Sequence, residues 1–357
     1  MRKGNFIGLL LLAFCAACRF FRPVADFYSQ TLYPVISGGL SALSSVIPFS
    51  FEEIVVLAFA AILIGILVRT IVRKEKFGRW LGKTLVVLMW LVVWFYMGWG
   101  NNYHRTGLYE RNGIKTVAYD EDAFKGFLAT YTANLNALAV ESDTYDQARF
   151  EDEVKAFYTE VASNYGYAPL RRWQHVKKPL INRLFSAVGV QGYMGPFLAE
   201  SQVNGDVTCV EYPYVAAHEL SHLAGVTSEA EASYWGFACC RQSADAPVRY
   251  SGYLCLLPYV SQQAKALLPA EDYAAWMTTV SDKPKADLAA SREIWQAKRV
   301  GWIENIQRWM QNLLLKGNGV SEGTKDYFGV VSMLMTMDAR EAKSLSLQGE
   351  TDSVYRE

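Results

Sequence analysis

The sequence predicts a mainly α-helical protein, in which N-terminal transmembrane helices precede an α-rich α+β domain with a small sheet. Two observations lead to this prediction. The first hundred of the 357 residues are strongly apolar, whereas the remainder has the composition of a water-soluble domain. Beyond residue 120, apolar side chains recur at helical spacing in several stretches, and only 196–203 looks extended. We therefore expect a membrane anchor over 1–100, a globular domain over 101–338 and a polar tail over 339–357.

The anchor contains three apolar runs that are candidates for membrane spans, at about 6–21, 54–72 and 84–99. The first run is short, and its charged start also fits a signal peptide that is cleaved. Because two more apolar runs follow and no small-residue cleavage motif leads into a clean polar stretch, the sequence favours a retained helix. Residues 22–53, which prolines and glycines interrupt, are expected to form a loop or an interfacial segment.

Positive charges predict the orientation of these spans. The segment 69–83 carries six Lys and Arg residues against the single acid Glu75, and Met1 is followed by Arg2 and Lys3. Loops rich in Lys and Arg stay on the cytoplasmic side of the membrane. The sequence therefore predicts a multi-pass protein of the cytoplasmic membrane whose chain beyond about residue 101 is extracytoplasmic.

Charge and cysteine content exclude some functions. The formal net charge is zero, which gives no indication of a nucleic-acid-binding surface. The six cysteines show no paired spacing of the zinc-ribbon type, and whether any of them form a disulfide stays open. The partners predicted from the sequence are therefore the lipid bilayer and, from the motif described next, a peptide or protein substrate.

The motif His218-Glu219-Leu-Ser-His222 is the strongest functional signal in the chain. Residues four apart share one face of a helix, so both imidazoles can reach one metal ion. Pro213 suits the first turn of this helix and Gly225 its C-terminal cap. The pattern is typical of zinc metallopeptidases, in which the two histidines bind Zn²⁺ and the glutamate is the general base. It predicts a zincin-like domain with His218 and His222 as metal ligands and Glu219 as the catalytic residue.

A catalytic zinc ion usually has a third protein ligand. A third histidine at the common spacing would fall at position 228, which is Ser228, so the nearest candidates are Glu229 and Glu231. Each has another explanation, because Glu231 can complete a capping box with Ser228 and Glu229 can be an acid favoured in a first helical turn. From the residues alone, both glutamates remain candidates.

Resemblance to known peptidases favours one of them. The stretch Glu229-Ala-Glu231-Ala looks like the one that follows His-Glu-x-x-His in several gluzincin-like peptidases, where the Glu before Ala binds the metal; this implies Glu231. The whole chain resembles an uncharacterised family of bacterial membrane proteins with three N-terminal spans and a predicted zinc peptidase domain. The segments that carry this resemblance are Ile47–Ser50, Trp99–Tyr103 with Arg105, Gly195–Phe197 with Glu200 and Asn204, His218–Ala232, Arg249–Tyr253 and Tyr327–Val331.

The expected function is therefore a membrane-anchored zinc metallopeptidase that hydrolyses peptide bonds outside the cytoplasmic membrane. Tyr193, Tyr234 and Tyr250 are candidates for the hydroxyl that stabilises the oxyanion. The strand at 196–203 is either an edge strand that binds the substrate backbone or an ordinary core strand. Two alternatives remain, namely a non-catalytic metal sensor and a scaffold whose zinc site is closed by a fourth ligand such as Cys239 or Cys240.

Overall fold

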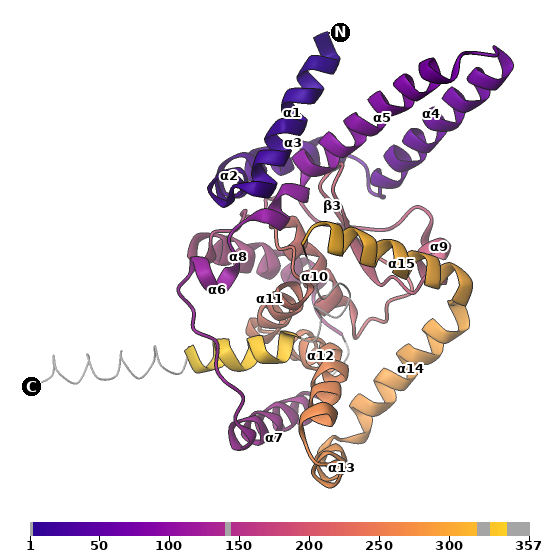
Figure 1. Cartoon of the computed structure of the whole chain (residues 1–357). Helices are drawn as coiled ribbons and strands as arrows, with labels where there is room; N and C mark the ends of the chain where they lie inside the picture. The colour runs from indigo at the N-terminus through magenta and orange to yellow at the C-terminus, as the bar shows by residue number, and fades with distance from the viewer. Residues whose placement is uncertain (1–2, 140–143, 320–328, 341–357) are drawn as a thin grey trace, which may run out of the picture.

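The computed structural model describes residues 3–139, 144–319 and 329–340. It is α-rich with one small mixed sheet, as the sequence predicts (Figure 1). Two helices are long and apolar enough to cross a membrane, α4 (Glu52–Val72) and α5 (Phe77–Gly98), and they form a hairpin that projects from the rest of the chain. Few of the side chains in their apolar stretches are buried, which fits a lipid surrounding.

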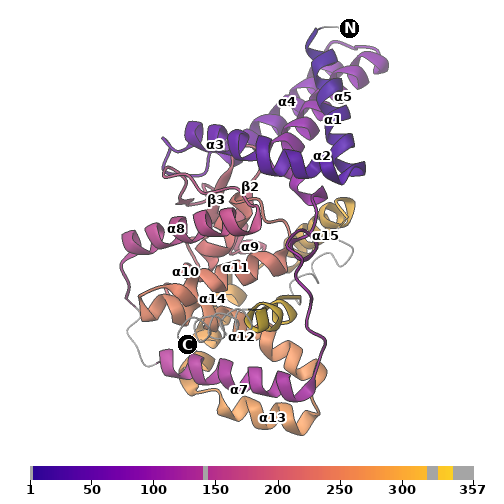
Figure 2. The same ribbon diagram turned by 90° about the vertical axis from the view of Figure 1, so that its left-hand side faces the viewer.

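The first predicted span, at about 6–21, is the first part of a longer helical segment that is sharply bent. Helix α1 (Lys3–Phe20) packs along α5, but it qualifies as a span only together with the segment that follows it. That segment, α2 (Arg22–Phe27), a π-helical turn η1 (Tyr28–Leu32) and α3 (Tyr33–Ser44), bends away by 114° and lies across the top of the globular part (Figure 2). Among the described residues there are thus two such helices, or three if this bent pair is one span.

Helices make up most of the remaining chain, with α7 and α13 at the end opposite to α4 and α5 (Figure 2). The helical periodicity predicted over 121–165 is confirmed as two helices, α7 and α8. Of the predicted tail, 341–357 lies outside the described residues. The helices of this part are η2 (Gly100–His104), α6 (Leu108–Arg111), α7 (Glu121–Leu138), α8 (Gln147–Tyr165), α9 (Asn182–Ala187), α10 (Tyr212–Leu223), α11 (Glu229–Gln242), α12 (Ala246–Leu267), α13 (Ala270–Thr279), α14 (Asp282–Lys298), α15 (Gly301–Gly317) and a last helix over 330–340.

The sheet has three strands in the order β1 (Val176–Lys177), β3 (Glu200–Val203) and β2 (Gly192–Gly195). Strand β3 pairs in parallel with β1 and antiparallel with β2. The strand predicted over 196–203 is therefore shorter than expected, and it is not an edge strand. Since both of its sides are paired, β3 has no edge left for a substrate, and the outer strands of the sheet are β1 and β2, which both contact α10.

Buried charged groups fix the start of α4 to the sheet. The Glu200 carboxylate accepts hydrogen bonds from the backbone N–H groups of Phe51 and Glu52. It also forms an ion pair with Lys177, whose Nζ lies 2.6 Å from Oε1 of Glu200. The Glu52 carboxylate in turn accepts the N–H groups of Phe197 and Leu198. Because buried charges are stable only when they are paired and hydrogen-bonded, these contacts join the span and the domain rigidly.

We expect Lys177→Met to destabilise the protein by about 3–5 kcal/mol, because it leaves the Glu200 carboxylate buried without its cation. A fall of at least about 6 °C in Tm, measured on the detergent-solubilised protein, is the expected result. The matched control is Lys298→Met, which breaks an exposed ion pair with Asp206 and should cost under about 1 kcal/mol. Equal shifts in the two variants would contradict this role of Lys177.

Candidate metal centre

Helix α10 carries the His-Glu-x-x-His motif and runs through the centre of the fold (Figure 1). Pro213 lies in its first turn, as predicted. Gly225 follows its end with φ +95°, a conformation that favours glycine. The N–H of Gly225 bonds to the carbonyl of His222, and the N–H of Val226 bonds to that of Ser221, which is a Schellman motif. The chain therefore reverses sharply just after His222.

The next helix, α11, begins immediately after this turn and packs against α10. Ser228 is its N-cap, and the Ser228 hydroxyl accepts a hydrogen bond from the backbone N–H of Glu231. Gly236 lets the two helices approach closely, since a Cβ at that position would lie 3.1 Å from the backbone nitrogen of His218. The first turn of α11 is thereby held beside the last turn of α10.

Three side chains from these two helices converge on one point. The Nε2 atoms of His218 and His222 lie 3.3 Å apart. The Oε2 atom of Glu229 lies 3.3 Å from the first and 3.5 Å from the second. Within the part of the chain that the structure describes, this is the group of His, Cys, Asp and Glu side chains that could hold a metal ion.

Glu231, which the peptidase resemblance implies as the third ligand, does not join this group. Its Oε2 accepts a hydrogen bond of 2.5 Å from the hydroxyl of Tyr167, on the other side of α11. Glu229 occupies the expected position instead. Side chains two residues apart point in directions about 200° apart around the helix axis. Only one of the two glutamates can therefore face the histidines. The geometry therefore favours Glu229, the other candidate from the sequence, over Glu231 as the third donor.

Hydrogen bonding prepares His222 to bind a cation. Its Nδ1 lies 2.8 Å from the carbonyl oxygen of Val226, which can only accept, so Nδ1 carries the proton and Nε2 faces the cluster. Burial opposes a charge on His222, but the Glu229 carboxylate outweighs it and raises the pKa of His222 to about 9. Burial would raise the pKa of Glu229, yet the two imidazoles hold it well below its usual range. The Glu229 carboxylate therefore favours a positive charge on His222, and the histidines keep Glu229 ionised.

Glu219 lies on the same helix and is buried beside the edge strand β2. Burial raises the pKa of its carboxyl to about 8, a value near the operating range of a general acid or base. A Cβ at Gly192 of β2 would lie 2.6 Å from the Cγ of Glu219, so only glycine leaves room for this side chain. The backbone carbonyl of Glu219 accepts a hydrogen bond from Ser201 of β3.

The N-terminal helices contact the cluster directly, which sequence reasoning did not predict. The Trp99 indole, one residue beyond α5, donates to the carbonyl of His222 at 2.8 Å. The Tyr33 hydroxyl of α3 donates to the carbonyl of Leu223 at 2.7 Å. The carbonyl of His222 also accepts the N–H of Gly225, so Trp99 is a second donor to it, whereas Tyr33 bonds to a carbonyl in the last turn of α10. The only sequence signal was the aromatic character of the segments that flank the spans.

Two of the three tyrosines predicted as candidate oxyanion donors have hydroxyls that bond to other carboxylates. The Tyr193 hydroxyl donates to Glu53, and the Tyr250 hydroxyl donates to Asp287. Tyr234 lines a pocket between α8, α11 and the last helix. Two other tyrosines lie within electrostatic reach of Glu229: burial, with a contribution from this carboxylate, raises the pKa of Tyr259 to about 12 and also raises that of Tyr103. The Glu229 carboxylate therefore acts on both of these hydroxyls.

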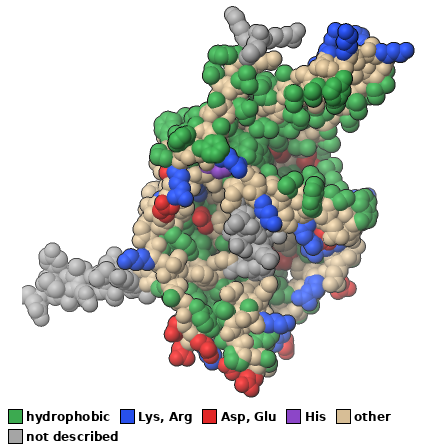
Figure 3. Space-filling model, viewed as in Figure 1, with side chains coloured by type: hydrophobic (Ala, Val, Ile, Leu, Met, Phe, Trp, Pro, Cys, Tyr) green, Lys and Arg blue, Asp and Glu red, His purple; other side chains and the backbone are tan. Residues whose placement is uncertain are grey.

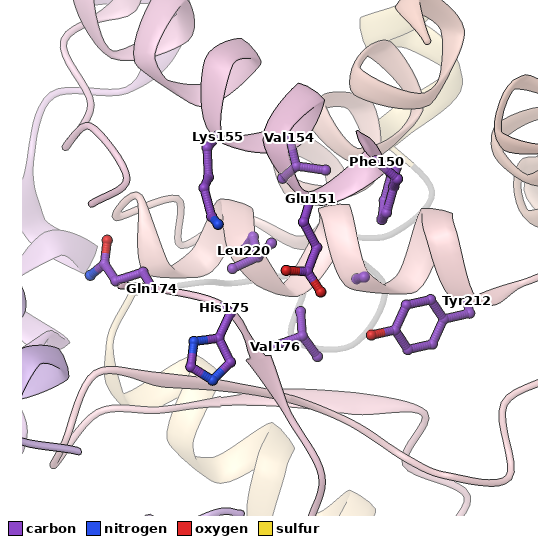
Figure 4. A pocket seen from close by; sticks show the side chains of 10 residues that line it. Phe150, Glu151, Val154, Lys155, Gln174, His175, Val176, Tyr212 and Leu220 are labelled. Carbon is purple, nitrogen blue, oxygen red and sulfur yellow. The ribbon is translucent and has the colours of Figure 1, made fainter. Parts of the chain in front are cut away.

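The two cysteines predicted as a possible fourth ligand do not join the cluster, and neither does His175, another histidine that packs near α10. Burial raises the pKa values of the Cys239 and Cys240 thiols, and neither belongs to the group that could hold a metal. His175 lines a small pocket on the face of α10 that Ala216 and Leu220 form, opposite to the motif histidines (Figure 4). The structure thus supplies no fourth protein ligand from these three residues.

A family model described as "Protein of unknown function (DUF3810)" matches residues 28–335, a range that includes α10 and α11. No curated protein and no solved structure matches the chain.

Proposed function

We propose that this chain, which belongs to the DUF3810 family, is a membrane-anchored zinc metallopeptidase that cleaves peptide bonds outside the cytoplasmic membrane. The observation that carries this proposal is the spacing of the three donor atoms. Ligand atoms about 2.0–2.2 Å from a tetrahedral zinc ion lie about 3.3–3.6 Å from one another. The separations among His218, His222 and Glu229 are 3.3, 3.3 and 3.5 Å.

The donor types fit zinc as well as the distances do. Two imidazoles and one carboxylate are a typical set for a catalytic zinc ion, and three protein ligands leave a fourth position for water. The Glu229 carboxylate favours a positive charge next to it, and a bound cation would supply this charge. When bound, zinc would polarise the scissile carbonyl and lower the pKa of its water to about 7.

The chain's own residues supply the proton transfers. Glu219 is on the same helix as both histidines, and in this role its carboxylate takes a proton from the attacking water and gives it to the leaving amine. Burial raises the pKa of this carboxyl to about 8, and a bound zinc ion nearby would lower it toward values at which the carboxylate can accept the proton. Tyr259 and Tyr103 are the hydroxyls that we assign to the developing oxyanion.

The outer edge of β2, which pairs with no other strand among the described residues, is the place where the substrate backbone would bind. Its other edge pairs with β3, and α10 packs against both strands. A peptide added to this edge would form main-chain hydrogen bonds beside Glu219. This is the role that the sequence suggested for 196–203, transferred to the neighbouring strand.

Gly192→Ala is expected to lower kcat by at least about tenfold while zinc stays bound, because the new Cβ would displace the Glu219 side chain. Zinc content and peptide cleavage are measured on the same preparation. The control is Gly205→Ala, since a Cβ there meets its nearest atom only at 3.6 Å, an ordinary contact. Unchanged cleavage in Gly192→Ala would show that Glu219 does not act from this position.

The distribution of positive charge supports the proposed extracytoplasmic side of the domain. The basic residues of 69–83 gather at the tip of the α4–α5 hairpin, far from the globular part (Figure 3). If this tip is cytoplasmic, as the positive-inside rule states, the candidate metal centre at the other end of α5 is outside. A reporter fused to residue 357 and one inserted after Lys74 should then give opposite topology signals.

The direct test uses the full-length protein purified in detergent. We expect about one zinc ion per chain, and cleavage of a mixed peptide library that a chelator abolishes and added zinc restores. Zinc without any cleavage would instead favour a non-catalytic metal sensor. The bond from Trp99 to the His222 carbonyl is the observation that favours this second candidate, because it couples the cluster to a span.

A further inference from the structure

Helix α15 (Gly301–Gly317) exposes one continuous apolar face. At about 100° per residue, its large apolar side chains fall on one side of the helix. Six of them are exposed by between 46 % and 68 %, which is far more than a helix packed in a domain shows. They are Trp302, Ile306, Trp309, Met310, Leu313 and Leu314.

The opposite face of α15 carries polar side chains and one buried leucine. Leu315 is buried, and Glu304 forms an ion pair with Arg308 at 2.6 Å. Polar side chains thus occupy the side nearer the domain, while the apolar side faces outward. This is the reverse of a helix that covers a core, and it leaves the apolar face without a partner in the described part of the chain.

The position of α15 identifies what covers this face. Immediately after its end, the Asn318 side chain accepts a hydrogen bond from the Tyr96 hydroxyl of α5, and the Gly317 carbonyl accepts one from Arg19 of α1. Both partners lie near the domain-side ends of helices from the apolar N-terminal segment. Figure 1 shows α15 crossing below these ends, transverse to α5. The helix therefore lies at the level where the bilayer surface would be.

Neighbouring segments extend the same apolar surface. The backbone N–H of Val300 donates to the carbonyl of Ala187, which joins α15 to α9. At the start of α9, Leu180 and Leu184 are exposed by 48 % and 49 %. The apolar face thus spans two segments that adjoin the foot of the spans.

We propose that the exposed face of α15, together with the start of α9, is embedded in the lipid headgroup region of the same bilayer that α4 and α5 cross. Two observations favour lipid over a protein partner. The face is continuous with the apolar spans, to which α15 is hydrogen-bonded, and it carries two tryptophans, the residue enriched at bilayer interfaces. An amphipathic helix of this kind lies in the plane of the membrane. It would fix the height and tilt of the domain above the lipid.

The test is nitroxide depth measurement on the full-length protein in lipid nanodiscs. A label is attached after Trp309→Cys or, as the matched control on the opposite face, after Arg308→Cys, both in a Cys209→Ser background that removes the exposed native thiol. We expect the label at position 309 to be several-fold more accessible to oxygen, which concentrates in lipid, than to a water-soluble nickel complex. The label at position 308 should show the opposite preference. Leu313→Cys repeats the measurement should Trp309→Cys fail to fold.

Two results would overturn the proposal. Equal access of the nickel complex to positions 309 and 308 would place both faces of α15 in water. Protection of position 309 from both reagents would show that protein, such as a second copy of this chain, covers the face. Nanodiscs that each hold a single copy of the protein then separate the two explanations. Protection that disappears there comes from a second copy, and protection that remains comes from a contact within the chain.

Discussion

Glu219→Gln is expected to retain zinc and to lower peptide cleavage by about 10²–10⁴-fold. The amide keeps the size of the side chain next to Gly192, but it cannot take a proton from water. Metal analysis and cleavage rates on one preparation separate a lost base from a lost metal. The control is Glu151→Gln, which changes an acid in the pocket on the opposite face of α10 (Figure 4) and should leave both quantities unchanged. Undiminished cleavage in Glu219→Gln would exclude this residue as the base.

Glu229→Gln is expected to lose zinc, whereas Glu231→Gln is expected to keep it. Loss of a partner that only orients a ligand already costs about 10–100-fold in metal affinity, and loss of a ligand should cost more. Zinc affinity by competition with a chromophoric chelator measures the difference. Glu231 is the matched control because it lies in the same turn of α11 and its carboxylate contacts Tyr167 instead. Retention of zinc by Glu229→Gln and its loss from Glu231→Gln would reverse the assignment and support the peptidase resemblance.

Features that depend on local geometry could be predicted from the sequence. His218 and His222 face one another because residues four apart always share a helix face. Pro213 and Gly225 bound α10, and Ser228 caps α11, because their conformational preferences act within one turn. The α-rich fold and the two apolar helices α4 and α5 follow from composition and periodicity in the same way.

Features that depend on packing could not be predicted. Both acids after the turn were recognised, but which one faces the histidines depends on the rotation of α11, which Gly236 fixes against the backbone of α10. The sequence predicts a strand within 196–203, but it does not show whether this strand is at the edge or in the centre of the sheet. In the structure, β3 is the central strand. The contact of Trp99 with His222 joins residues 123 positions apart and has no local signal.

The most direct test of the central claim is X-ray absorption spectroscopy at the zinc edge on the full-length protein. Zinc bound by His218, His222, Glu229 and one water gives only nitrogen and oxygen neighbours at about 2.0–2.2 Å, with the outer scattering of two imidazoles. A sulfur neighbour at about 2.3 Å would mean that a cysteine closes the site, as in a structural zinc centre. That result, or a protein that binds no zinc, would contradict the proposed catalytic centre.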